Sequence, residues 1–486
     1  MSEVVKIEYH DQTHMKVRCD PGVAYELNDY FTFDVPGAKF MPAYRNKMWD
    51  GKVRLFNVMS CLLYVGLITY VEKFCKDRDY EFELDAVEYE PEEFSLKEAH
   101  DFIEKLGPKM RPRDYQLDAF VHAVRNKRSL LLSPTASGKS FIIYLIMRYY
   151  SAKTLIIVPT TSLVSQLASD FADYGFDSDA NVHRIFGGQD KHTDRPVTIS
   201  TWQSIYKLPK GYFDQFDVVI GDEAHLFKAK SMQSIMSKLT DCAFRFGFTG
   251  TLDGTQTHKL VLEGLFGPVR KVTTTAELIE KGTIAELTIK AIVLKYPDDI
   301  RKAMTKADYK NEMDYLVNCR ARNKFIRNLL LSLEGNTLLL FQYVDKHGKV
   351  LYNDIKNEAG DRPVFFVSGA VDAEAREEIR RIVESEKSAI VVASYGTFST
   401  GVNIRNLHNV IFASPSKSKI RNLQSIGRGL RKSETKSNSV LYDISDDLTW
   451  KNRKNFTILH FVERIKVYNE EKFEYKIYPV NLKVTT

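Results

Sequence analysis

The sequence Ser133-Pro134-Thr135-Ala136-Ser137-Gly138-Lys139-Ser140 separates an apolar segment typical of a buried strand, residues 129–132, from an apolar segment typical of a helix. Small residues between a strand and a helix, ending in Gly-Lys-Ser, are typical of a phosphate-binding loop. The strict pattern begins with glycine, whereas this loop begins with Ser133. The alternative is an ordinary turn built of small residues. We expect a phosphate-binding loop on a parallel α/β sheet.

The last two residues of this loop carry the chemistry of a nucleotide site. Lys139 supplies a positive charge for the outer phosphates, and the Ser140 hydroxyl supplies an oxygen ligand for Mg²⁺. We therefore predict that residues 133–140 bind ATP together with Mg²⁺.

A second, largely apolar segment, residues 216–220, leads into the sequence Asp222-Glu223-Ala224-His225. Parallel strands place such residues at the carboxyl edge of the sheet, where ligands bind. Asp222 is expected to hold Mg²⁺ through its water shell, and Glu223 to orient and deprotonate the attacking water. The alternative is a helix N-cap, which the position behind the loop and the following His225 argue against.

Apolar strands alternate with helical stretches along most of the chain, which predicts parallel sheets with crossover helices. The rhythm occurs twice, so we predict two α/β lobes. The strands expected in the first lobe are 129–132, 154–158, 197–200, 216–220 and 243–248, and those in the second are 337–341, 364–367, 389–393, 409–412 and 439–444.

The first 86 residues are aromatic-rich and often alternate in polarity, which favours strands. Asp50-Gly51 predicts a tight hairpin turn between 48–49 and 52–56. Basic and aromatic residues around it suit phosphate contacts backed by stacking. The alternative is a small aromatic core with lysines outside it. The nucleic-acid candidates here are Arg45, Lys47, Trp49, Lys52 and Arg54.

These patterns predict an α/β protein with two parallel-sheet lobes in tandem and a small α+β N-terminal module. The predicted boundaries are 1–88 for the module, 89–285 and 286–450 for the lobes, and 451–486 for a C-terminal helix and strand.

Bulk composition excludes several classes of protein. The net charge of +6 arises from 69 basic and 63 acidic residues, so nucleic-acid binding must come from local patches. No apolar run reaches the roughly 18 residues of a membrane span, which predicts an intracellular, cytoplasmic protein without membrane contact. The five cysteines are widely spaced, which argues against a disulfide framework or a zinc site.

The acidic sequence at 222–225, together with Gly138-Lys139-Ser140, resembles the signature of the superfamily 2 helicases of DEAH type, whose fold is two RecA-like lobes. Further motifs of that family occur in the expected order. They are the adenine-reading element at 113–116, the hinge at 249–251, motif five at 397–403 and motif six at 424–431.

The resemblance implies a role for several residues of these motifs. Arg113 and Gln116 would read adenine, while Gly401 and Asn403 would contact the nucleotide. Lys139, Asp222, Glu223 and His225 would be catalytic together with Gln424 and two arginine fingers, Arg428 and Arg431, which would stabilise charge on the transferred phosphoryl group. An arginine run of this kind is otherwise a solvated helix face.

The same resemblance implies contacts to a nucleic-acid strand from small residues and exposed amides, which grip phosphates without reading sequence. Each of them is otherwise a helix cap or a turn. The candidates are Pro159, Thr160, Thr161, Gly187, Gly188, Thr201 and Gln203 in the first lobe, and Gly369 and Thr397 in the second.

Over its whole length the chain resembles the recombination and repair helicases of T-even-type bacteriophages. That resemblance implies a 3′ to 5′ motor acting on branched DNA and on RNA–DNA hybrids. We also expect a monomer that binds single-stranded DNA, with single-strand-binding or recombination proteins as partners. The residues alone indicate only a nucleic-acid-stimulated ATPase. The alternatives are a passive binding module, a duplex translocase that does not separate strands, and an RNA helicase.

Overall fold

The computed structural model describes residues 3–252, 255–397, 404, 406–414 and 438–484. The chain divides into two compact units, one of residues 1–133 and 138–273, the other of residues 134–137 and 274–486. The first unit holds the N-terminal module and the first lobe, and the second unit holds the second lobe and the C-terminal residues.

Lobe 1 is built on a seven-stranded sheet in the order β13-β7-β12-β11-β8-β10-β9, in which every described pairing is parallel. All five predicted strands occur within one or two residues of their expected ends. The strands are β7 (Arg128–Leu132), β8 (Thr154–Val158), β9 (Val182–Ile185), β10 (Val197–Thr201), β11 (Val218–Asp222), β12 (Phe244–Thr249) and β13 (Val269–Lys271).

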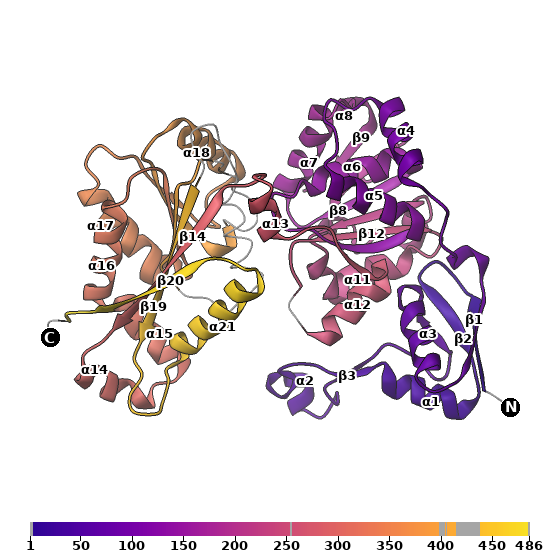
Figure 1. Cartoon of the computed structure of the whole chain (residues 1–486), viewed down its shortest axis with the longest axis horizontal. Coiled ribbons are helices and arrows are strands. Elements are labelled where there is room, and N and C mark those ends of the chain that lie inside the picture. Colours follow the sequence, from indigo (N-terminus) through magenta and orange to yellow (C-terminus); the bar gives the residue numbers. More distant parts are fainter. Residues whose placement is uncertain (1–2, 253–254, 398–403, 405, 415–437, 485–486) are drawn as a thin grey trace. The chain divides into compact units, whose positions relative to one another are not determined.

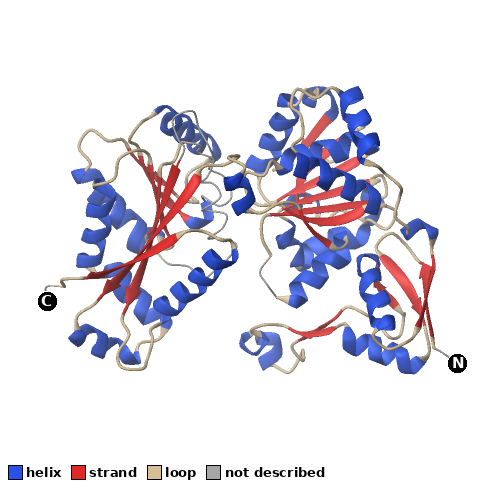
Figure 2. Ribbon diagram, in the orientation of Figure 1, coloured by secondary structure: helices blue, strands red, loops and turns tan. Residues whose placement is uncertain are grey.

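Helices cover both faces of this sheet (Figures 1 and 2), which explains why its strands are apolar at successive positions. Ile156 of β8 faces one hydrophobic cluster, and its neighbours Leu155 and Ile157 face the other. The helices are α4 (Leu96–Leu106), α5 (Asp114–Asn126), α6 (Lys139–Tyr150), α7 (Thr161–Asp173) and α8 (Ser178–Asn181) on the first side, then α9 (Trp202–Ile205), α10 (Lys210–Phe213), α11 (Lys230–Lys238) and α12 (Gln256–Phe266).

Lobe 2 is built on a second seven-stranded sheet in the order β16-β17-β15-β18-β19-β14-β20, also parallel in every described pairing. Strand β14 was not predicted, and the predicted C-terminal strand, here β20, pairs with β14 as an edge of this sheet. The strands are β14 (Glu286–Lys295), β15 (Thr337–Phe341), β16 (Val364–Val367), β17 (Ile390–Ser394), β18 (Asn409–Phe412), β19 (Asn438–Asp447) and β20 (Tyr475–Asn481).

The described helices of lobe 2 pack on this sheet through one apolar side each. Leu316 of α15, Ile326 of α16 and Leu351 of α17 lie in its main hydrophobic cluster. The helices are α14 (Asp298–Ala303), α15 (Tyr309–Asn318), α16 (Arg320–Leu331), α17 (Lys349–Glu358), α18 (Ala373–Ser385) and α21 (Phe456–Glu470).

The N-terminal module has a four-stranded mixed sheet in the order β5-β2-β1-β6, with helices α1 and α3 packed against it. The predicted fold class, two RecA-like parallel-sheet lobes with a small α+β module, is confirmed. The elements are β1 (Val4–Tyr9), β2 (His14–Arg18), α1 (Pro21–Tyr30), β5 (Leu62–Tyr64), α3 (Ile68–Lys76) and β6 (Glu81–Asp85).

The predicted tight hairpin at Asp50-Gly51 is wrong. Gly51 does adopt a positive φ of 81°, but the strand that pairs with β4 (Lys52–Arg54) is β3 (Thr32–Asp34). The connection between them spans residues 35–51 and contains the short helix α2 (Pro42–Arg45). Pro42 begins this helix and suits its first turn. Residues 46–50, which follow the helix, form no strand that could pair with β4. Figure 1 shows α2 at the end of this arm, away from the four-stranded sheet.

The N-terminal module is joined to lobe 1 by buried polar contacts. Arg245 of β12 is fully buried and donates a hydrogen bond to Thr13 Oγ1 at 2.7 Å. Arg128 of β7 donates to Gln12 Oε1 at 3.0 Å. The turn between β1 and β2 therefore lies at the end of the lobe 1 sheet where β7 and β12 begin.

Among the residues that the structure describes, none of the helices is long and apolar enough to cross a membrane.

Candidate functional site

The loop at 133–140 lies where β7 ends and α6 begins, at the carboxyl edge of the lobe 1 sheet. Ser133 is fully buried, and its N–H donates to the carbonyl of Thr249 at the end of β12 with a distance of 2.8 Å. A serine hydroxymethyl group is small enough for that position, so the departure from glycine leaves the strand-to-helix geometry in place.

The backbone of the loop has the left-handed conformations that expose amides in a phosphate-binding loop. Ala136 has a φ of 67° and Gly138 a φ of 79°. A Cβ on Gly138 would lie 2.4 Å from Gln116 Nε2, which is closer than Cβ atoms approach other atoms. The backbone angle therefore favours glycine at 138, and a larger residue there would also displace the side-chain amide of Gln116. The hydroxyl of Ser137 donates to the carbonyl of Pro134 at 2.7 Å and closes the turn.

Lys139 reaches the two carboxylates at the end of β11. Its Nζ lies 3.3 Å from Glu223 Oε1 and 3.9 Å from Asp222 Oδ1. Their side chains are between 16% and 22% exposed, so these charges interact with little screening by solvent. The structure thus brings together Lys139, Asp222 and Glu223 from two separate predicted motifs.

The two carboxyl groups respond differently to this environment. Burial alone raises the pKa of the Glu223 carboxyl, but the charge of Lys139 and the hydrogen bond from His225 outweigh it and hold the pKa below its usual range. Burial and the neighbouring charge of Glu223 raise the pKa of the Asp222 carboxyl, and Lys139 only partly compensates. Glu223 is therefore ionised at neutral pH.

His225 connects the acidic pair to the strand that carries the predicted hinge. Its Nδ1 lies 3.3 Å from Glu223 Oε2 and 3.0 Å from Thr249 Oγ1. The Thr249 hydroxyl also donates to the carbonyl of Thr251 at 2.9 Å. The imidazole of His225 thus links the position of the Glu223 carboxylate to the conformation of residues 249–251.

The predicted adenine-reading residues lie at the start of α5, next to the loop. Gln116 Oε1 accepts from the Arg113 N–H at 2.9 Å, and Gln116 Nε2 donates to the Gly138 carbonyl at 3.3 Å. Arg113 Nη1 donates to the Tyr115 hydroxyl at 2.9 Å. Gln116 therefore joins the beginning of α5 to the phosphate-binding loop.

The oxygen donors near the loop suit a hard cation. Ser140 offers a hydroxyl and Asp222 a carboxylate, which are the ligand types that Mg²⁺ takes when nucleotide phosphates and water supply the rest. The described residues contain no group of three or more His, Cys, Asp or Glu side chains that could hold a metal ion alone. The donor set therefore fits Mg²⁺ brought in with a nucleotide.

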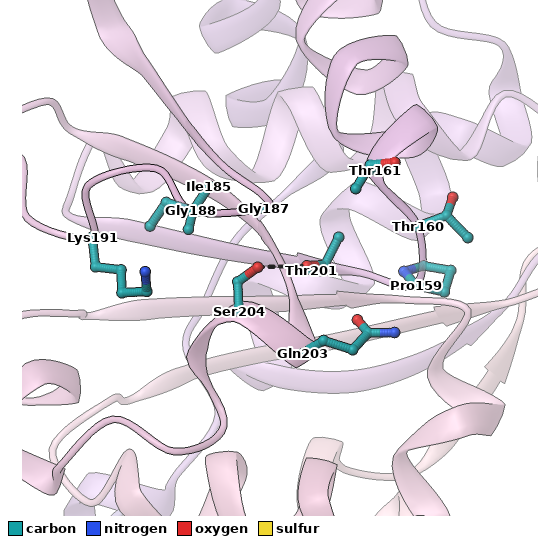
Figure 3. A pocket seen from close by; sticks show the side chains of 10 residues that line it. All are labelled: Pro159, Thr160, Thr161, Ile185, Gly187, Gly188, Lys191, Thr201, Gln203 and Ser204. Atoms are coloured by element: carbon teal, nitrogen blue, oxygen red, sulfur yellow. Dashed lines mark hydrogen bonds between the residues drawn. The ribbon is translucent and has the colours of Figure 1, made fainter. Parts of the chain in front are cut away.

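A pocket of about 630 Å³ opens at the same edge of the sheet, beyond β8 and β10 (Figure 3). All seven residues predicted in lobe 1 to contact a nucleic-acid strand line it. The Thr201 and Ser204 hydroxyls are hydrogen-bonded at 2.9 Å, as drawn in Figure 3. The predicted lining residues are Pro159, Thr160, Thr161, Gly187, Gly188, Thr201 and Gln203.

Sequence reasoning missed three lining residues, Ile185, Lys191 and Ser204. Lys191 is the cationic residue of the pocket, and its Nζ donates to the Gln189 carbonyl at 3.1 Å. It stands only three positions after Gly188, so a search for cations beside the predicted glycine pair would have found it.

In lobe 2, the described candidates follow two neighbouring strands. Gly369 comes two residues after β16, and Thr397 comes three residues after β17. The Thr397 hydroxyl is hydrogen-bonded to that of Ser394 at 2.8 Å. Both residues thus lie at the carboxyl edge of the lobe 2 sheet. The remaining candidates of this lobe, Gly401, Asn403, Gln424, Arg428 and Arg431, lie outside the described residues.

The candidates of the N-terminal module belong to the arm between β3 and β4 and to β4 itself, which contains Lys52 and Arg54. Arg45, Lys47 and Lys52 are exposed. Trp49 is only partly exposed and donates from Nε1 to the Lys52 carbonyl at 2.8 Å, and Arg54 pairs with Asp50. The four cations therefore lie on the surface, where Arg45 also donates from Nε to the Lys39 carbonyl at 3.4 Å, and only Trp49 is partly buried.

Three family models match successive parts of the chain. The first is the N-terminal model of the DNA helicase UvsW, over residues 4–85. The second is the res subunit of type III restriction enzymes, over residues 109–254. The third is the helicase conserved C-terminal domain, over residues 321–433.

Whole-chain comparisons agree with these models. The chain is 38% identical to the ATP-dependent DNA helicase UvsW of Enterobacteria phage T4, over 98% of this chain and 100% of the relative. It is 26% identical to the DNA 3′–5′ translocase XPB2 of Sulfurisphaera tokodaii, over 68% of this chain and 80% of that protein.

Among solved structures, the crystal structure of T4 UvsW matches 99% of this chain and 100% of its own, at 36% identity and a TM-score of 0.51. A type ISP restriction-modification enzyme, LlaBIII, matches 76% of this chain and 32% of its own at 16% identity and a TM-score of 0.57, a likeness of fold alone. With the loop, the acidic pair and the sheets in place, the chain belongs to the UvsW family of ATP-dependent DNA helicases.

Proposed function

We propose that this enzyme uses the energy of ATP hydrolysis to remodel branched DNA, including forks, four-way junctions and RNA–DNA hybrid loops, in recombination and repair. The observation that carries the proposal is the placement of the loop at 133–140, the carboxylates of 222–223 and the pocket of Figure 3 along one edge of one sheet. A bound nucleotide and a bound DNA strand would therefore both contact residues at the carboxyl ends of the lobe 1 β-strands.

For the nucleotide, Lys139 neutralises the outer phosphates, which draw its ammonium group away from Glu223. With Lys139 on the phosphates, the Glu223 carboxylate would accept a proton from the attacking water. Ser140 and Asp222 would hold Mg²⁺, which supplies charge neutralisation at the phosphates when bound. Gln116 and Arg113 contact the adenine edge.

Residues of lobe 2 complete the proposed chemistry. Arg428 and Arg431 provide positive charge to the transferred phosphoryl group, and Gln424 helps to orient the attacking water. Gly401 and Asn403 contact the nucleotide.

For the DNA, the pocket offers hydroxyls, exposed backbone and one ammonium group, which suit sugar-phosphate contacts rather than base reading. Gly369 and Thr397 would grip the same strand from lobe 2. The exposed cations Arg45, Lys47 and Lys52 of the N-terminal arm contact the duplex phosphates of a branch.

The deciding experiment measures ATP hydrolysis and strand separation side by side on single strands, forks, four-way junctions and RNA–DNA hybrids. We expect branched DNA to stimulate hydrolysis and to be unwound, and Lys139→Ala to lose both while keeping its fold. Equal rates on all substrates, or normal hydrolysis by the Lys139→Ala variant, would contradict the proposal.

A second candidate function is translocation along duplex DNA without strand separation, which the likeness to a protein named as a DNA 3′–5′ translocase favours. It predicts full stimulation of hydrolysis by unbranched duplex, displacement of a bound roadblock from that duplex, and no released single strand.

A further inference from the structure

The hydroxyl of Ser140 is hydrogen-bonded to the phenol oxygen of Tyr174 at 2.8 Å. Ser140 is the second residue of α6, and Tyr174 directly follows α7. The contact thus joins the phosphate-binding loop to a residue 34 positions away that no predicted motif contains.

The surroundings of Tyr174 fix its ring. The residue is 8% exposed, and the ring meets Phe141 edge-on at 4.9 Å between centroids and Tyr144 at 5.4 Å. Its carbonyl accepts a hydrogen bond from the Lys109 N–H at 3.1 Å. Either hydroxyl of the pair can donate across the 2.8 Å contact with Ser140. The Tyr174 oxygen is a stationary partner for the serine, because these neighbours hold the ring in place.

A serine that binds a metal ion offers an oxygen lone pair, so its own hydrogen must point to an acceptor elsewhere. If the hydrogen is free to rotate, part of the metal's binding energy is spent on orienting the hydroxyl. The Tyr174 oxygen lies at the distance of a good acceptor.

We propose that Tyr174 is a positioning residue that accepts the hydrogen of the Ser140 hydroxyl and so directs an oxygen lone pair of Ser140 toward the Mg²⁺ of bound nucleotide. The proposal rests on the role of Ser140 as a metal ligand, which belongs to the proposed function. It adds a residue outside the predicted motifs to the site.

The neighbouring Tyr144 provides a matched control. It is also buried, its ring packs against Tyr174, and its hydroxyl accepts from Arg148 Nη1 at 3.1 Å instead of contacting the loop. Tyr174→Phe and Tyr144→Phe each remove one hydroxyl and keep the ring, so they perturb packing to a similar degree.

The test is a fluorescence titration of the full chain with an ADP that carries an N-methylanthraniloyl group. Affinity is measured first in EDTA and then as free Mg²⁺ is raised. We expect Tyr174→Phe to bind metal-free ADP within about twofold of the wild type but to need about three- to tenfold more Mg²⁺ for the half-maximal gain in affinity, the size of one net hydrogen bond. Tyr144→Phe should match the wild type in both conditions.

Three results would overturn the proposal. An unchanged Mg²⁺ requirement in Tyr174→Phe would show that Ser140 needs no partner, and a lower requirement would show that Tyr174 competes with the metal. Equal losses of affinity with and without Mg²⁺ would show that the tyrosine supports the loop as a whole.

A double variant, compared with Ser140→Ala alone, separates this proposal from the function on which it rests. In a Ser140→Ala background, adding Tyr174→Phe should change the Mg²⁺ requirement no further, and an additional shift would contradict action through Ser140. If the wild type itself bound no nucleotide, the ATP site would be rejected, and the role of Tyr174 with it.

Discussion

The backbone of Glu223 adopts a left-handed conformation with φ of 52°, which is uncommon for a residue other than glycine. Such a conformation costs of order 1 kcal/mol or more and persists where surrounding contacts impose it. Here the Glu223 N–H donates to Asp222 Oδ1 at 2.9 Å, and the side chain meets Lys139 and His225. The strained turn thus places the carboxylate of a candidate general base beside the lysine of the loop.

A second buried group predicts how the stability of lobe 2 depends on pH. His347 is fully buried, with Nε2 3.2 Å from Asn323 Oδ1 and Nδ1 3.0 Å from Ser414 Oγ. Burial, and then the charge of Arg322, lower the pKa of His347 from 6.5 to about 3. The unfolded chain therefore takes up a proton below about pH 6.5 while the folded chain does not, so stability is present above that pH and is lost as the pH falls toward 3.

We expect this one histidine to cost about 2 kcal/mol of unfolding free energy at pH 5, one and a half pH units below its unfolded pKa. His347→Gln removes this titratable group, so only the wild type should lose the roughly 2 kcal/mol of unfolding free energy when the pH falls from 7.5 to 5. Urea unfolding at the two pH values measures this difference. Parallel pH profiles for the two proteins would show that His347 is not held neutral.

At the scale of elements, the carboxyl ends of five strands collect the candidate functions of lobe 1. β7 leads into the phosphate-binding loop, β11 into the acidic pair and β12 into the hinge, while β8 and β10 lead into the pocket. Because β12 lies between β7 and β11, the predicted hinge borders both parts of the candidate nucleotide site. The parallel sheet thus explains why motifs far apart in the sequence meet.

The N-terminal module packs closely against the amino end of β12 and against the helix α12. A Cβ added to Gly66 would lie 1.9 Å from the carbonyl oxygen of Glu263 in α12. We expect Gly66→Ala to force the module away from α12 and to destabilise the first unit by about 1–3 kcal/mol or more, as for an overpacked core. Urea unfolding and limited proteolysis would measure the loss.

Gly22→Ala is the matched control, because a Cβ at Gly22 meets no atom within 4 Å. It should leave the unfolding midpoint unchanged or slightly higher. Equal effects of the two substitutions would mean that the close contact between the module and α12 does not support the first unit.

Elements with a strong local pattern were predictable. The strands at Thr154–Val158, Thr337–Phe341 and Val364–Val367 have the expected ends because both faces of their sheets are buried and the apolar run alone defines them. The loop at 133–140 was predictable despite Ser133, since the strand before it and the Gly-Lys-Ser after it define the geometry.

Features that depend on tertiary contacts were not predictable. Asp50-Gly51 is a sequence typical of a tight turn, yet the strand that follows it, β4, pairs with residues 32–34. The arm of residues 35–51 separates the two strands, so local sequence does not predict this pairing. The edge strand β20 pairs with β14, and its Tyr475 lies opposite Ile289, so no local sequence pattern predicts that partner. Tyr174 reads as an ordinary core aromatic, and only the fold brings it to Ser140.

At the scale of the whole molecule, the N-terminal module shares a compact unit with lobe 1, so we expect the two to move together. Its arm exposes cations and large apolar side chains together: Phe40 is 66% exposed and Met48 is 80% exposed. A branched duplex held by this arm would therefore be carried with lobe 1 during each ATP cycle.

We expect Arg45→Ala combined with Lys47→Ala to weaken binding to forked DNA and to lower the slope of log affinity against log salt by up to about two, one unit for each lost phosphate contact. Lys73→Ala combined with Lys76→Ala removes the same charge from exposed positions of α3 in the same module. Fluorescence anisotropy at several salt concentrations compares the two, and equal slopes would place the DNA elsewhere.

The central claim is that DNA-stimulated ATP hydrolysis takes place at the edge of the lobe 1 sheet with Glu223 as the base. It is tested most directly by the rate of phosphate release at saturating ATP and Mg²⁺, with and without forked DNA, for the wild type and Glu223→Gln. We predict stimulation of the wild type by DNA, and a loss of about a hundredfold or more in the variant with nucleotide affinity kept within a few fold. A Glu223→Gln variant that still hydrolyses ATP at the DNA-stimulated rate would contradict the account.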